Sequence, residues 1–239
     1  MRIARFVTLV LTAHGSADPR SAANAHAVAD SVRLLRPSLD VRVAFCEQNF
    51  PNLREVLPTL CHGAVVVPLL LADAYHARVD IPAMIAESGA DVAQADVLGE
   101  DDRLIHVLRM RLEHAGIARH DSRVGVLVAA VGSSNPEANG RTEAVARELT
   151  LTTRWTAATA FATGPQPGLA EAADLLRQRG ATRLAVAPWF LAPGKIIDRV
   201  ADFAHTRGLP MSSPLGAHRR VAETVLDRFD AALAQQLAA

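Results

Sequence analysis

The chain has 239 residues, half of them hydrophobic, and its 25 basic residues balance 25 acidic ones. This length fits one large or two small globular domains. The zero net charge argues against a nucleic-acid footprint or a membrane-surface patch, and no apolar run approaches the roughly 20 residues that a membrane helix needs. Cys46 and Cys61 lack CxxC spacing, so we expect reduced thiols in a cytoplasmic protein and no zinc knuckle.

Strand-like runs alternate with helical patterns from the start of the chain. The first four strands are predicted at 6–13, 40–45, 63–71 and 91–99, and the helices that follow them at 21–35, 51–60, 80–88 and 101–116. The first strand is apolar on both faces, as in a parallel sheet with helices on both sides. Asp80 stands where a helix N-cap is expected, and we assign it no catalytic role. The alternation predicts an α/β fold with mainly parallel sheets in a three-layer α/β/α arrangement.

The whole pattern then repeats. The matching positions, in register to within a few residues, include Phe45 with Phe161, Pro51 with Pro167, Pro68 with Pro188, and Gly99 with Gly216. Self-similarity across more than 100 positions indicates an internal duplication. The join lies near residues 116–123, so we predict two similar domains, 1–118 and 119–239.

Three polar side chains of the first copy are not kept in the second. The pairs are His14 and Val131, Glu47 and Thr163, and His76 and Ile196. All three polar residues follow predicted parallel strands, at the edge where open α/β sheets bind ligands. Any one of them alone would be interpreted as an ordinary polar residue, but their joint loss favours a shared function. Two imidazoles and a carboxylate suit a borderline divalent metal, so we predict that His14 and His76 bind a metal.

Four nearby residues are weaker candidates for binding a substrate. Gly15 and Ser16 stand where backbone N–H groups can face an anion at a helix N-terminus. Arg20 and Arg78 lie close in sequence to the two histidines, and their guanidinium groups suit carboxylates. A solvated helix surface explains the two arginines equally well.

The segments "LTAHGS", "VAFCEQNFP" and "VPLLLADAYHARVDIP" together resemble the class II chelatases that act on sirohydrochlorin. The segments "LGED" and "PLGAH" look like the leucine-glycine ends of that family's fourth strand. The resemblance implies two chelatase-like (flavodoxin-like) domains. It also implies a lyase that inserts iron or cobalt into this tetrapyrrole, for sirohaem or cobalamin biosynthesis, without an organic cofactor. This chain has Asp73 and Ala74 where many members carry a glycine, so the turn before His76 is expected to follow a path of its own.

The resemblance also implies roles for the three polar residues. His14 and His76 would bind the metal and accept pyrrole protons, and Glu47 would orient a histidine or take a proton. The second half, without the histidines, would be chemically silent, in a monomer with pseudo-two-fold symmetry or in a homodimer. A non-catalytic tetrapyrrole or metal carrier remains an alternative. A phosphohydrolase with a histidine nucleophile is less favoured, because Ala13 stands where such enzymes usually place an arginine.

Overall fold

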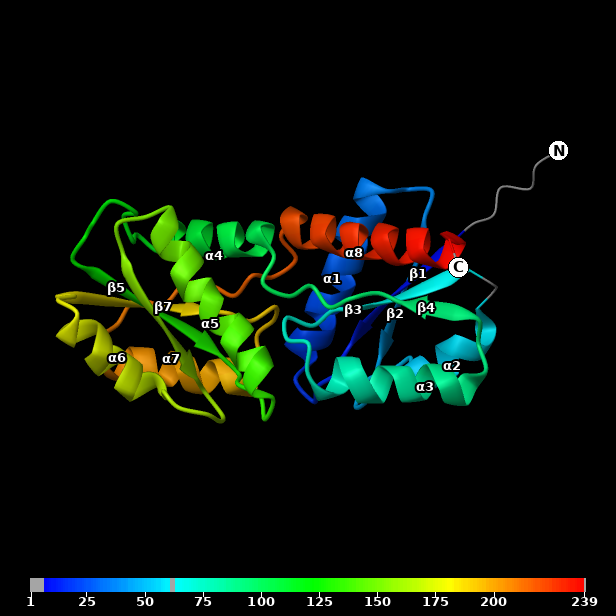
Figure 1. The fold of residues 1–239 in the computed structure, drawn as a ribbon, viewed down its shortest axis with the longest axis horizontal. Coiled ribbons are helices and arrows are strands. Elements are labelled where there is room, and N and C mark those ends of the chain that lie inside the picture. Colours follow the sequence, from blue (N-terminus) through cyan, green and yellow to red (C-terminus); the bar gives the residue numbers. More distant parts are fainter. Residues whose placement is uncertain (1–6, 61–62, 239) are drawn as a thin grey trace. The chain divides into compact units, whose positions relative to one another are not determined.

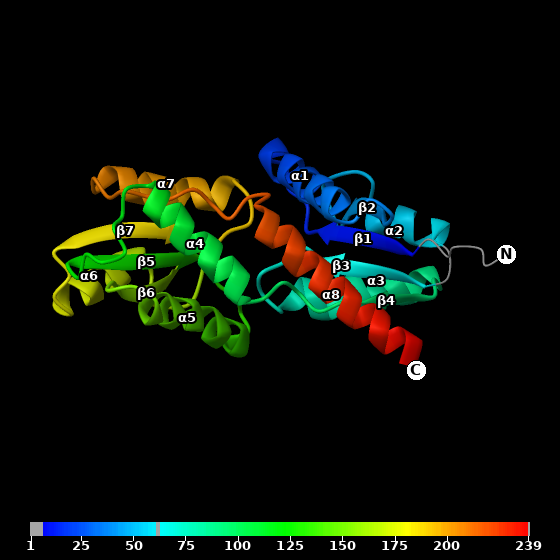
Figure 2. The same cartoon turned by 90° about the horizontal axis from the view of Figure 1, so that it is seen from above.

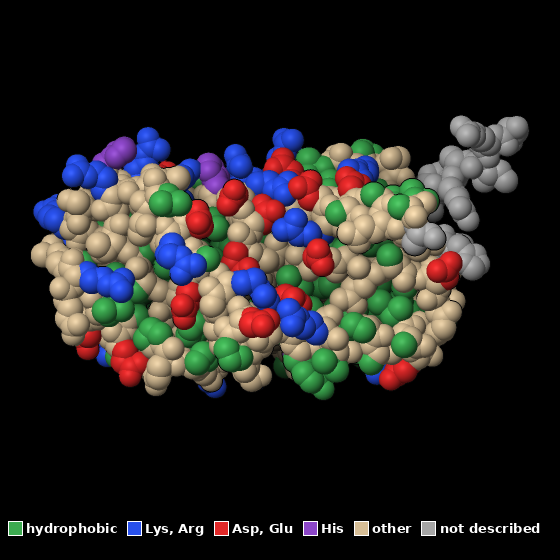
Figure 3. Space-filling view, in the orientation of Figure 1, with side chains coloured by type: hydrophobic (Ala, Val, Ile, Leu, Met, Phe, Trp, Pro, Cys, Tyr) green, Lys and Arg blue, Asp and Glu red, His purple; other side chains and the backbone are tan. Residues whose placement is uncertain are grey.

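We describe the fold from a computed structural model, which covers residues 7–60 and 63–238. Phe6, the predicted start of the first strand, and Cys61 lie outside these ranges. Strands and helices alternate along the chain, as predicted (Figure 1). Within the described residues, no helix is both long enough and apolar enough to span a membrane. Basic and acidic side chains are interspersed over the face shown in Figure 3.

The chain divides into two compact units. Unit 1 consists of Met1–Gly99 with Ala217–Ala239, and unit 2 consists of Glu100–Gly216. The predicted domains, 1–118 and 119–239, follow the sequence repeats, and the compact units differ from them in one element each. Helix α4 (Asp102–His114) packs in unit 2, and helix α8 (Arg219–Ala238) packs in unit 1. Each repeat therefore contributes its last helix to the unit built mainly by the other repeat.

Unit 1 contains a four-stranded parallel sheet in the order β2-β1-β3-β4. Its strands are β1 (Thr8–Ala13), β2 (Asp40–Phe45), β3 (Ala64–Pro68) and β4 (Val92–Gln94). Helix α1 (Pro19–Leu35) and α8 pack together on one face, and Figure 2 shows α8 lying across the sheet. The other face carries α2 (Leu53–Val56), a 3-10 turn (Leu57–Thr59) and α3 (Ile81–Ser88). A single π-helical turn, η2 (His76–Asp80), leads into α3.

Unit 2 repeats this plan around a parallel sheet in the order β6-β5-β7. Its strands are β5 (Val124–Ala130), β6 (Thr156–Phe161) and β7 (Arg183–Pro188). Helices α4 and α5 (Pro136–Leu151) cover one face, and α6 (Leu169–Gln178) and α7 (Lys195–Thr206) cover the other. In the part of the chain that the structure describes, the counterpart of β4 is reduced to one parallel bridge, between Val186 and Met211.

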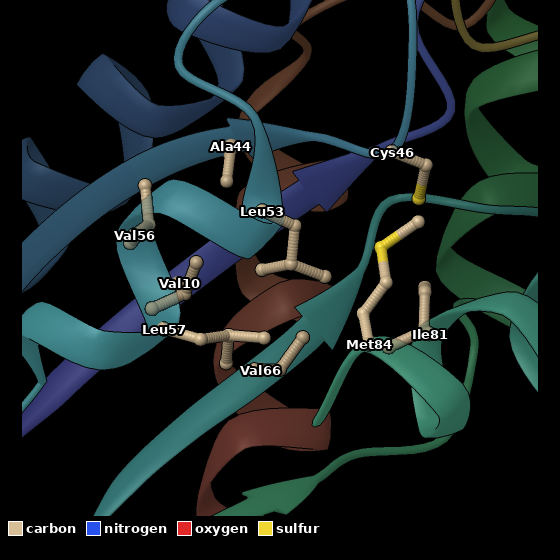
Figure 4. Close-up of a cluster of buried hydrophobic side chains, with 9 residues drawn as sticks. All are labelled: Val10, Ala44, Cys46, Leu53, Val56, Leu57, Val66, Ile81 and Met84. Carbon is tan, nitrogen blue, oxygen red and sulfur yellow. The ribbon is translucent and has the colours of Figure 1, made fainter. Parts of the chain in front are cut away.

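The apolar cores explain why the central strands are apolar on both faces. In unit 1, Val10 and Val66 of the sheet pack against Leu53 and Leu57, and all four are fully buried. Figure 4 shows this cluster, in which the sulfur-bearing ends of Cys46 and Met84 point toward each other. The cluster fixes α2 and α3 on the sheet and thereby holds the loops that carry the polar residues described next.

Candidate metal-binding and catalytic site

The turn after β1 places His14 beside the loop that follows β2. The Glu47 N–H donates to the His14 carbonyl at 3.0 Å, so the two loops are joined by a backbone hydrogen bond. Gly15 has a φ of +100°, and a Cβ atom there would lie 1.8 Å from the Glu47 carbonyl oxygen. Only glycine permits both this conformation and this close approach. The glycine after the histidine is thus required by the position of Glu47.

The structure brings together His14, Glu47 and His76, which follow three different strands. The His14 Nε2 atom lies 3.3 Å from Glu47 Oε1, and the His14 and His76 rings meet edge to face with centroids 4.0 Å apart. Their side chains are 34%, 52% and 41% exposed for His14, Glu47 and His76, so all three are accessible to a ligand.

The sequence-based assignment of Asp80 as a helix cap is wrong. Its side chain makes no capping hydrogen bond, although the residue stands at the N-cap position of α3. Instead, Asp80 Oδ2 lies 2.5 Å from His76 Nδ1, four residues earlier and across the π-helical turn. Asp80 is therefore a site residue that the sequence analysis missed. The sequence does contain a signal for this role, because the second copy replaces both residues together. It has Ile196 in place of His76 and Val200 in place of Asp80.

A cavity of about 240 Å³ adjoins the cluster on the side of α3. Its lining includes Glu47, His76, Asp80, Cys46 and Arg54. Burial, together with the nearby carboxylates of Asp80 and Glu47, raises the pKa of the Cys46 thiol to about 11. Cys46 is free and buried, and its thiol is protonated at neutral pH.

Three of the four weaker candidates already have intramolecular partners. Arg20 forms a bidentate ion pair with Asp18, and Arg78 pairs with Asp73 at 2.6 Å. The Ser16 N–H donates to the Asn49 side chain at 2.6 Å. A substrate carboxylate that bound to these groups would have to replace the present acceptors.

The corresponding edge of unit 2 has a different character. Val131 is 39% exposed, Thr163 donates its hydroxyl to the Val131 carbonyl at 2.8 Å, and Ile196 packs against the apolar cluster under α7. A hollow of about 590 Å³ lies beside Gly132 and Thr163, and it has no histidine in its lining. Unit 2 thus keeps the frame of the site without its imidazoles.

Across residues 7–60 and 63–238, no group of three or more His, Cys, Asp and Glu side chains is arranged to hold a metal ion. What the geometry offers is an imidazole pair in ring contact, with one carboxylate beside each imidazole. Such a group can hold an ion with part of its coordination left open and can accept protons near neutral pH.

Comparison with known proteins agrees with the two similar units of the structure in indicating a duplicated chain. Residues 8–115 and 125–232 each match the family model described as CbiX, which confirms the internal duplication. The chain is 25% identical over 207 residues to a sirohydrochlorin cobaltochelatase of Priestia megaterium, covering 82% of this chain and 67% of the relative. It is 26% identical over 180 residues to a sirohydrochlorin ferrochelatase of the same organism, covering 70% and 67%. The solved structure of SirB from Bacillus subtilis with Fe³⁺ has the same fold, with a TM-score of 0.83 at 20% identity over 97% of both chains.

Proposed function

Because the chain belongs to the CbiX family, we propose that it is a sirohydrochlorin chelatase that inserts iron or cobalt into this tetrapyrrole. The observation that carries the proposal is the contact of His14, Glu47 and His76 at the carboxyl edge of the unit 1 sheet. The names of the two Priestia relatives, one a cobaltochelatase and one a ferrochelatase, support the reaction and both metals. The product would serve sirohaem or cobalamin biosynthesis.

The hydrogen bonds of His14 favour a metal position beside Glu47. His14 Nδ1 lies 2.8 Å from the Gly15 carbonyl, which only accepts, so Nδ1 carries the proton. In the neutral ring, the Nε2 lone pair then faces Glu47 Oε1 at 3.3 Å, and two acceptors face each other. A cation between them relieves this repulsion. Since first-row ions such as zinc bind imidazole nitrogen and carboxylate oxygen at roughly 2.0–2.2 Å, one ion can bridge this separation.

The same groups can take up the protons that the reaction releases. Insertion of a divalent ion replaces two pyrrole N–H bonds with metal–nitrogen bonds and sets free two protons. Neutral His14 and His76 are suitable acceptors near pH 7, and Glu47 is close enough to relay or hold a proton. The metal is a substrate in this scheme, so ligands that release it to the macrocycle are an advantage.

The remaining assignments are proposals of the same kind. Gly15, Ser16, Arg20 and Arg78 are proposed to contact the carboxylate-bearing edge of the substrate, with the arginines exchanging Asp18 and Asp73 for it. We propose a cytoplasmic location, with the protein acting as a monomer or a homodimer.

The test is anaerobic incubation of the purified protein with sirohydrochlorin and either Fe²⁺ or Co²⁺, followed by absorbance. His14→Ala and His76→Ala should each lose most of the insertion rate, and Glu47→Gln should slow it less. His205→Ala, which removes an exposed imidazole at the end of α7, is the matched control and should insert at the wild-type rate. Tight binding of the tetrapyrrole without faster insertion would indicate a carrier instead.

A further inference from the structure

The contact between His76 and Asp80 bears on which ring nitrogen of His76 carries the proton and on how the ring is oriented. We infer that Asp80 is a positioning residue that fixes the tautomer and the orientation of His76, and that the π-helical turn exists to place it there. The inference deepens the proposed chelatase function, on which its kinetic part rests.

The two copies of the fold show what the π-helical turn changes. In unit 2, α7 is a regular α-helix whose core-facing residues include Ile197 and Val200, which are 5% and 0% exposed. In unit 1, the aligned Ala77 is also buried, at 5%, but the next buried residue is Ile81, at 0%, one position later than in unit 2. The wider turn thus moves the position aligned with Val200 away from the core. That position is Asp80, whose side chain is 29% exposed.

Unit 2 replaces both members of the His76–Asp80 pair together. Where unit 1 has His76 and Asp80, unit 2 has Ile196 and Val200, both of which pack in the apolar cluster under α7. Asp80 follows a helical turn that begins at His76, and the aligned Val200 lies within α7, which begins at Lys195, so neither copy needs a carboxylate there to start its helix. The restriction of the carboxylate to the copy that has the histidine, in a π-turn of the kind that recurs at functional sites, points to a role that depends on the imidazole.

The chemistry of the contact defines that role. An ionised carboxylate only accepts hydrogen bonds, so His76 Nδ1 must carry the proton that it shares with Asp80 at 2.5 Å. The lone pair of the neutral ring is then on Nε2, the nitrogen that Asp80 does not occupy. A carboxylate in this position fixes the ring orientation and keeps the lone pair on the free nitrogen. Asp80 acts through His76 and need not touch metal or substrate.

The direct test is the tautomer of His76 in the metal-free protein, measured from its ¹⁵N side-chain chemical shifts at a pH where the ring is neutral. The wild-type protein should show the Nδ1–H tautomer. Asp80→Asn, whose amide can accept or donate, should show a mixture of both tautomers. Glu87→Gln on α3, which removes a carboxylate paired with Arg54 instead, is the control and should match the wild type. A predominant Nε2–H tautomer in the wild-type protein would overturn the inference, whatever the variants do.

Kinetics supply the second readout. Asp80→Asn should lower kcat for metal insertion by about 10- to 100-fold, as expected for loss of a carboxylate behind a histidine ligand. The KM for sirohydrochlorin should stay close to the wild-type value. Unchanged kcat in Asp80→Asn would refute the inference while the wild-type enzyme remained a chelatase. If the wild-type protein inserted no metal, the proposed function would fail, and the tautomer measurement would still decide whether Asp80 positions His76.

Discussion

Replacing Gly15 with alanine tests whether close approach of two backbones holds Glu47 in the site. Any L-residue at this φ of +100° pays about 1–2 kcal/mol in conformational strain. The added Cβ would also lie 1.8 Å from the Glu47 carbonyl oxygen and 2.8 Å from its carbon, so this backbone must move. That movement breaks the hydrogen bonds from Glu47 N–H to His14 and from Ser16 N–H to Asn49, each contributing about 1 kcal/mol net. Gly15→Ala should therefore destabilise unit 1 by about 3–4 kcal/mol.

Gly132→Ala in unit 2 is the matched control. Its φ of +95° carries similar strain, but the added Cβ meets only side-chain atoms of Pro165 and Phe161, at 3.1 and 3.2 Å. The cost should stay near 1–2 kcal/mol. Urea unfolding followed by circular dichroism reports both units, and the fluorescence of Trp155 and Trp189 reports unit 2 alone. Equal destabilisation by the two substitutions, or wild-type insertion in Gly15→Ala, would refute the reasoning.

Three further predictions concern groups outside this turn. Because the Cys46 thiol has a raised pKa of about 11, iodoacetamide at pH 8 should leave the Cys46 peptide largely unmodified by mass spectrometry; rapid alkylation of the folded protein would contradict this. Hydrogen bonds from Arg123 hold the pKa of Asp121 well below its usual range, so Asp121 stabilises the fold above about pH 4 and loses this effect as the pH falls. Asp121→Asn should accordingly lower the urea midpoint of unfolding at pH 7. The difference in midpoint between variant and wild type should shrink as the pH falls below about 4. A difference that did not change with pH would show that the lowered pKa of Asp121 is not its cause. Val131→Ala and Ile196→Val should cost on the order of 1 kcal/mol or less in the same unfolding assay while insertion persists, and loss of insertion in either would show that unit 2 is not chemically silent.

Much of the fold could be predicted because its signals are local and repeated. The fully buried runs of β1 and β3 are apolar on both faces, which indicates parallel strands before any contact is known. The family match to both halves confirms the duplication that the paired prolines and glycines indicated. Comparison of the two copies with each other drew attention to His14, Glu47 and His76, and the structure brings these three side chains together.

The exchange of the last helices could not be predicted from the sequence. The loops at Gly99 and Gly216 are similar, and an amphipathic helix that follows either loop can cover the sheet of its own repeat or that of the other. The choice depends on packing between distant segments, such as α8 against α1 and β3. The fourth strand of unit 2 is reduced to the bridge at Met211, in a segment where Pro210 and Pro214 have no backbone N–H to donate to a sheet.

The role of Asp80 shows a different limit of sequence patterns. An aspartate before Ile81 and Pro82 fits a helix N-cap, and that pattern alone favours the structural explanation. A π-helical turn adds one residue without disturbing the apolar spacing, since core residues four apart are as typical of a helix as core residues three apart. Periodicity therefore cannot distinguish an aspartate that caps the helix from one that turns back to His76. The second copy can, because it replaces the histidine and the carboxylate together and keeps the regular helix. In a duplicated chain, comparing the two copies residue by residue thus separates what the fold requires from what the chemistry requires.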